Sequence, residues 1–174
     1  MRYAAYVLLG YALLIVQAAV GVLVPFNDWA PNLLLPLVIY LGVANDVQVV
    51  RGAALSFLLG YLLDVFCGSP MGLSTFVMVA SFLIARGTGL NLFTRGTILQ
   101  LVTTFAFAIV AGGMILALRG IFEPPAPFPI ESVGDTLFAL LAGSVTTALS
   151  APPLFLTLRR LDSLLTRRRE ETAP

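Results

Sequence analysis

The chain has 174 residues, of which 59% are hydrophobic and only 11% are charged, and its mean hydropathy is +0.96. A soluble domain carries about 25% charged residues, so this composition excludes a water-covered globular domain and predicts an integral membrane protein. Histidine is absent and there is one cysteine, which excludes histidine-based triads, His or Cys metal sites and an internal disulfide. We therefore expect no metal, no other cofactor and no nucleic-acid partner.

Six apolar runs follow one another along the chain. The first extends from Tyr3 to Val24, and the last two from Gly96 to Leu118 and from Thr136 to Leu158. Each of these three is long enough to cross a hydrocarbon core of roughly 30 Å, which requires about 20 apolar residues. We predict an all-α integral membrane protein with six transmembrane helices. The predicted spans are about 3–24, 31–46, 50–66, 70–86, 96–118 and 136–158.

The three middle runs are shorter than the others. They extend from Pro31 to Ala44, from Gly52 to Leu63 and from Met71 to Ala85. At a rise of 1.5 Å per residue the longest covers only about 22 Å. Each must therefore include polar flanking residues or lie behind the longer helices. We predict three short, protein-buried helices, and a re-entrant pair is the alternative.

The distribution of arginines predicts the orientation. With six spans and an internal amino terminus, one side of the membrane receives Arg2, Arg51, Arg86, Arg95, Arg159, Arg160, Arg167, Arg168 and Arg169, and the other receives Arg119 alone. Lys and Arg near the ends of spans favour the cytoplasmic side. We therefore expect a multi-pass protein of the bacterial cytoplasmic (inner) membrane with both termini in the cytoplasm and a basic tail over residues 159–174, which contacts membrane lipid.

Two of the predicted spans carry rows of small residues at intervals of four, which places each row on one helix face. In lipid, such faces allow neighbouring backbones to approach closely. The third span has Gly52, Ser56, Gly60 and Asp64, and the sixth has Ala139, Gly143, Thr147 and Ala151. We expect both faces to be buried inside the bundle.

Asp64 is the one acidic residue well inside a predicted span, and an intramembrane carboxylate is a candidate functional site. It stands three residues before the turn Cys67-Gly68-Ser69-Pro70. Three roles are open at this point: capping backbone N–H groups of the turn, a polar contact with a partner or a neighbouring helix, and ligand or proton binding.

Three segments together resemble the signature of the MreD family, the small membrane subunit of the bacterial rod-shape machinery. They are Pro31-Asn32-Leu33-Leu34-Leu35, Gly60-Tyr61-Leu62-Leu63-Asp64 and Gly68-Ser69-Pro70-Met71-Gly72. The resemblance covers roughly residues 31–86 and departs from the family at Ala30, where many members carry a basic residue. No residue is assigned a catalytic, cofactor-binding or metal-binding role. The structural or partner-contact candidates are Pro31, Asn32, Gly52, Ser56, Gly60, Asp64, Ser69, Pro70, Gly72 and Arg86.

The resemblance implies a non-enzymatic membrane scaffold that binds MreC and helps to organise lateral peptidoglycan synthesis. Through that complex it would associate with MreB, RodA, RodZ and the elongation penicillin-binding transpeptidase. The family also looks like the six-helix substrate-binding subunits of energy-coupling-factor vitamin transporters. A transporter subunit is therefore the alternative function, and it predicts a polar, ligand-sized cavity near the outer face. An intramembrane enzyme is disfavoured because no histidine or second carboxylate lies near Asp64 to form an acid and base pair.

Overall fold

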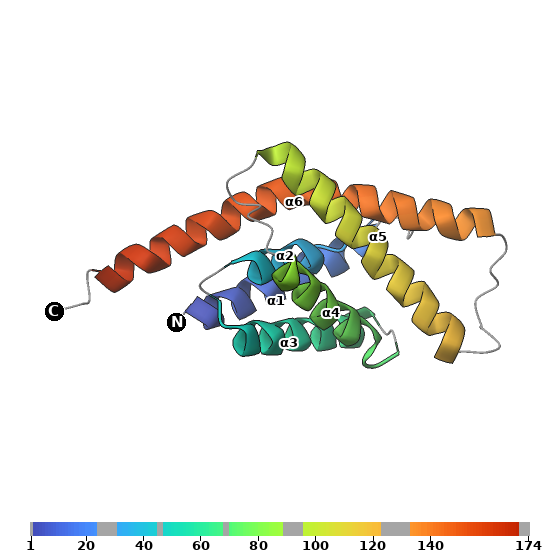
Figure 1. Cartoon of the computed structure of the whole chain (residues 1–174), viewed down its shortest axis with the longest axis horizontal. Helices are drawn as coiled ribbons and strands as arrows, with labels where there is room; N and C mark the ends of the chain where they lie inside the picture. The colour runs from blue at the N-terminus through green and yellow to red at the C-terminus, as the bar shows by residue number, and fades with distance from the viewer. Residues whose placement is uncertain are drawn as a thin grey trace.

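The computed structural model describes residues 2–23, 31–44, 47–67, 70–88, 96–122 and 133–170, and the regular elements in these ranges are all α-helices. This confirms the prediction of an all-α protein for the described part of the chain. Figure 1 shows the helices along the chain. They are α1 (Arg2–Leu23), α2 (Leu34–Val43), α3 (Val49–Cys67), α4 (Leu73–Gly87), α5 (Thr97–Phe122) and α6 (Val133–Glu170).

The six helices of the described ranges fall into two classes by length. Among the described residues α1, α3, α5 and α6 are long and apolar enough to cross a membrane. The 10 residues of α2 and the 15 of α4 cover only about 15 Å and 22 Å, so neither crosses a 30 Å core alone. The six-span prediction is thus confirmed only in part. The third predicted helix is longer than its apolar run because α3 continues through Asp64 to Cys67.

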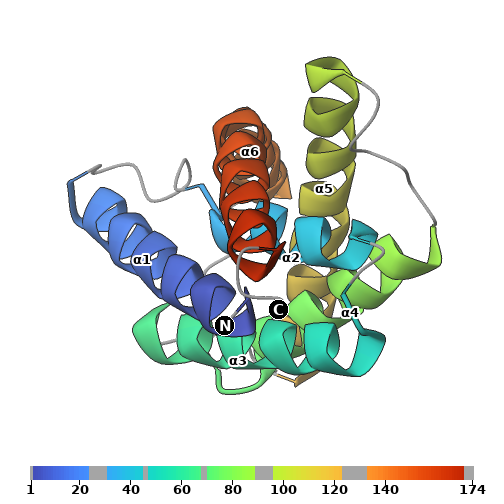
Figure 2. The same ribbon diagram turned by 90° about the vertical axis from the view of Figure 1, so that its left-hand side faces the viewer.

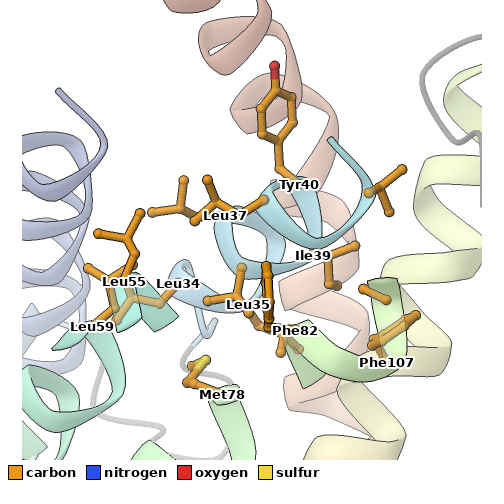
Figure 3. Close-up of a cluster of buried hydrophobic side chains, with 14 of the residues drawn as sticks. Leu34, Leu35, Leu37, Ile39, Tyr40, Leu55, Leu59, Met78, Phe82 and Phe107 are labelled. Atoms are coloured by element: carbon orange, nitrogen blue, oxygen red, sulfur yellow. The ribbon is translucent and has the colours of Figure 1, made fainter. Parts of the chain in front are cut away.

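The shortest helix, α2, lies at the centre of the bundle. Its ten residues are all buried, and Figure 2 shows α2 surrounded by the other five helices. Such burial follows from its sequence, because a helix that is apolar on every side has no face suited to water. Figure 3 shows the side chains that form this core. Those labelled are Leu34, Leu35, Leu37, Ile39 and Tyr40 of α2 with Leu55, Leu59, Met78, Phe82 and Phe107 of α3, α4 and α5.

Helix α4 packs closely against the second half of α2. A Cβ atom placed on Gly42 would lie 2.7 Å from the Cβ of Ala85 and 2.9 Å from the carbonyl oxygen of Phe82, so the approach requires glycine at this position. Directly after this contact, Nη1 of Arg86 donates a hydrogen bond of 2.6 Å to the carbonyl oxygen of Ala44. The end of α4 therefore stabilises the end of α2.

The last helix is a single element of 38 residues that contains Pro152 and Pro153. Figure 1 shows α6 changing direction near its middle, which is the part of the helix where the two prolines remove backbone donors and favour a bend. Beyond residue 158, where the last span was predicted to end, the helix continues to Glu170.

Candidate functional site

The candidate site comprises the starts of the two short helices, where sequence candidates and buried polar groups meet. At an α-helix start the first four N–H groups have no intrahelical partner. At α2 all four are paired by side chains. The N–H of Asn32 donates to Oγ1 of Thr147 at 2.9 Å, and the N–H of Leu33 donates to Oε1 of Gln17 at 3.0 Å. The N–H groups of Leu34 and Leu35 donate to Oδ1 of Asn32 at 3.2 and 3.3 Å.

Asn32 stands one residue before the N-cap Leu33, and its side chain caps the start of α2, a role for which asparagine is among the preferred residues. Pro31 precedes it and is half-buried. Pro36 follows the four capped positions and lies in the first turn of α2. A proline in the first turn costs no intrahelical hydrogen bond, because the N–H groups of these positions have no partner within the helix, and its fixed φ suits the helix start. The Pro-Asn segment thus forms the start of the central helix.

At α4 the same four N–H groups are paired mainly by one carboxylate. The N–H groups of Gly72 and Thr75 donate to Oδ2 of Asp64 at 3.0 and 3.1 Å, and that of Ser74 donates to Oδ1 at 2.9 Å. The hydroxyl of Thr75 also donates to Oδ2, at 2.8 Å. The N–H of Leu73 donates to the carbonyl oxygen of Pro70 at 3.2 Å. Both oxygens of a carboxylate that is 1% exposed are used in this arrangement, which has the geometry of the capping role.

The small residues of α3 allow this carboxylate to reach α4. A Cβ atom on Gly60 would lie 2.6 Å from the Cα of Thr75 and 3.0 Å from the carbonyl oxygen of Ser74. A Cβ atom on Gly52 would lie 2.5 Å from the ring of Phe82. The face with Gly52, Gly60 and Asp64 therefore packs against α4, with glycine where the two backbones approach most closely.

The remaining sequence candidates near this site have simpler positions. Ser56 is buried on the same face, and its hydroxyl donates to the carbonyl oxygen of Gly52 in its own helix. Gly72 has φ of +99°, a left-handed conformation that favours glycine. Pro70 is exposed and contributes its carbonyl oxygen. Ser69 lies outside the described residues, and Arg86 is at the far end of α4.

A second, partly buried polar cluster joins three helices at the opposite end of α2. The hydroxyl of Tyr6 on α1 donates to Oδ1 of Asp162 on α6 at 2.6 Å, and the hydroxyl of Tyr40 on α2 donates to Oδ2 at 2.5 Å. Figure 3 shows Tyr40 pointing away from the apolar side chains of the core. Asp162 thus connects α6, which continues into the predicted cytoplasmic tail, to α1 and α2.

Sequence reasoning missed Gln17, Thr147 and the cluster of Tyr6, Tyr40 and Asp162. Thr147 was predicted only as part of a small-residue face. A usable signal was present for Asp162, because it is an isolated acidic residue among the arginines of 159–169. No such local signal marks Gln17.

Together these groups define a polytopic helical membrane protein in which buried polar side chains position short inner helices. A sequence model of one family, described as rod shape-determining protein MreD, matches residues 1–160. The chain belongs to the MreD family, as the signature segments predicted. The family is one of shape-determining proteins and is not a known enzyme family. No curated protein and no solved structure matches the chain significantly.

Proposed function

We propose that the protein is a non-enzymatic scaffold of the cell-elongation machinery, which binds MreC in the cytoplasmic membrane and helps to organise lateral peptidoglycan synthesis. The observation that carries this proposal is the family match over residues 1–160, since membership of the family implies a role in rod-shape determination. MreB, RodA, RodZ and the elongation transpeptidase are proposed as partners within the same complex. The arginine distribution supports an orientation with both termini in the cytoplasm.

The use of the buried polar groups supports a scaffold. The Asp64 carboxylate accepts hydrogen bonds from three backbone N–H groups and one hydroxyl of α4. A carboxylate bonded in this way stabilises a helix start, and its two oxygens are directed at protein donors. The outward faces of the long helices carry exposed apolar side chains such as Leu8, Ile98 and Phe138, which suits contact with lipid or with a partner's membrane helix.

The proposed binding of MreC is tested by affinity purification of the tagged full-length chain from bacterial membranes in mild detergent, with quantitative mass spectrometry of the eluate. A membrane protein of similar size with the same tag is the control. We expect enrichment of MreC over the control, together with other elongation proteins. Recovery of no elongation protein, from a preparation in which the chain itself is monodisperse, would contradict the proposal.

The same purification separates the scaffold from the transporter alternative. A substrate-binding subunit of an energy-coupling-factor transporter would recover the transporter ATPases in place of MreC. The similarity to the six-helix fold of those subunits stays a prediction, since no solved structure matched. A shape assay adds a second readout. Depletion of the chain should turn rod-shaped cells round, and re-expression should restore the rods.

A further inference from the structure

A groove of about 370 Å³ lies between α1 and α3, near the start of each helix. It is lined by Tyr3, Arg51, Ala54, Leu55 and Leu58. Leu55 is buried and forms the floor, whereas Ala54 and Leu58 are exposed along the wall. Arg51, Ala54, Leu55 and Leu58 follow the spacing of one helix face, so the groove extends for about 10 Å along α3.

The groove is amphiphilic along its length. Its one cationic group, the guanidinium of Arg51, lies 5.5 Å from the centroid of the Tyr3 ring. A guanidinium stacked on an aromatic ring keeps the N–H donors of its edge available, and their planar fork matches a phosphate. Beyond this end, the wall along Ala54 and Leu58 is apolar. The groove therefore offers a phosphate-binding group next to a surface that suits a hydrocarbon chain.

The position of Arg51 in its helix also favours an anion. Arg51 lies in the first turn of α3, where the helix dipole disfavours a cation and favours a negative charge. The arginine therefore does not stabilise the helix at this position. A bound anion would interact favourably with both the guanidinium and the helix start.

We infer that the groove between α1 and α3 binds an anionic phospholipid, with its phosphate at Arg51 and part of an acyl chain along Ala54 and Leu58. A free phosphate would gain nothing from the apolar wall, and a neutral lipid would gain less from Arg51. The inference is independent of the proposed scaffold function, because it concerns only the groove and the surrounding bilayer.

The test uses the full-length protein, exchanged into detergent and titrated with phosphatidylglycerol or phosphatidylcholine of matched acyl chains, with binding followed by native mass spectrometry. We expect phosphatidylglycerol to bind about tenfold more tightly, because it carries a net negative charge, whereas the choline cation of phosphatidylcholine offsets its phosphate and is repelled by Arg51. Arg51→Gln should abolish this preference. Arg160→Gln removes the same charge from an exposed position on α6 and should leave the preference intact.

A second variant tests the apolar part of the groove. Ala54→Leu adds volume to the wall while retaining Arg51, and it should weaken binding of both lipids. Because Arg51 and Ala54 are exposed, both variants should unfold at the wild-type temperature, which circular dichroism verifies. Equal binding of the two lipids by the wild type, an unchanged preference in Arg51→Gln, or displacement of the lipid by inorganic phosphate would overturn the inference.

Discussion

At the starts of α2 and α4 the same backbone N–H groups are paired with different kinds of acceptor. Each short helix begins inside the protein, where its first four N–H groups require protein acceptors. At α2 the acceptors are neutral oxygens from α1, α6 and the capping Asn32. At α4 three of the four groups donate to the single carboxylate of Asp64 on α3.

This difference determines how each start should respond to mutation. The acceptors at the α2 start come from three segments, so the loss of Gln17 or Thr147 leaves one N–H group without a partner. At the α4 start one residue supplies most of the acceptors, so the loss of Asp64 leaves three N–H groups without a partner. Buried donors without partners destabilise a protein by about 1 to 3 kcal/mol each. The comparison therefore predicts a graded series of effects.

The largest effect is expected for Asp64→Leu, which leaves the N–H groups of Gly72, Ser74 and Thr75 unpaired. The fraction of monodisperse protein in detergent, measured by size-exclusion chromatography, should fall severely. Asp64→Asn should be intermediate, because an amide has one acceptor oxygen where the carboxylate uses two. An Asp64→Leu variant as stable as Asp64→Asn would show that these hydrogen bonds do not hold the start of α4.

A smaller loss is expected for Asn32→Leu. This change removes the acceptor of the Leu34 and Leu35 N–H groups but leaves the bonds to Gln17 and Thr147. The unfolding temperature in detergent should fall less than in Asp64→Leu. Asn32→Asp keeps an acceptor at this position and is the matched control. A larger fall in unfolding temperature for Asn32→Leu than for Asp64→Leu would contradict this difference between the two helix starts.

The close approach of α3 to α4 gives the next prediction. In Gly60→Ala the new Cβ would lie 2.6 Å from backbone atoms of α4, so the helices must separate at a cost of about 1 to 3 kcal/mol. Gly113→Ala in α5 is the control, because a Cβ there meets nothing within 4 Å. The unfolding temperature should fall in the first variant only. Equal tolerance of both would place the α3–α4 contact elsewhere.

The smallest of these effects is expected for Thr147→Val, which removes the acceptor of the Asn32 N–H. The expected destabilisation is about 1 kcal/mol. Thr157→Val on the same helix changes an exposed side chain whose hydroxyl bonds within α6, and it should have less effect. A larger fall in unfolding temperature for Thr157→Val than for Thr147→Val would contradict the role of Thr147 as the acceptor of the Asn32 N–H.

The sequence predicted the features that depend on composition and on neighbouring residues. Hydropathy predicted six helices, and the four-residue spacing on α3 identified the face that packs on α4. Asp64 could be related to its turn because Gly72 is only eight residues away.

Features that depend on contacts between distant segments were not predicted. Thr147 is 115 residues from Asn32, and Asp162 is 122 residues from Tyr40. No periodicity within one helix specifies which side chain of another will accept its N–H groups. The second span was predicted over 31–46, whereas α2 covers only Leu34–Val43, because the end of a helix within an apolar run is not marked by hydropathy alone.

The most direct test of the role of Asp64 is amide hydrogen exchange, resolved by residue with NMR in detergent micelles, for the wild type and Asp64→Asn. Because the asparagine keeps one acceptor oxygen, we predict that the amides among Gly72, Ser74 and Thr75 that faced the replaced oxygen lose protection in the variant, while the Leu33, Leu34 and Leu35 amides keep theirs. Unchanged protection at Gly72, Ser74 and Thr75 in the folded variant, or an equal loss at both helix starts, would contradict the assignment of Asp64 as the acceptor that holds α4.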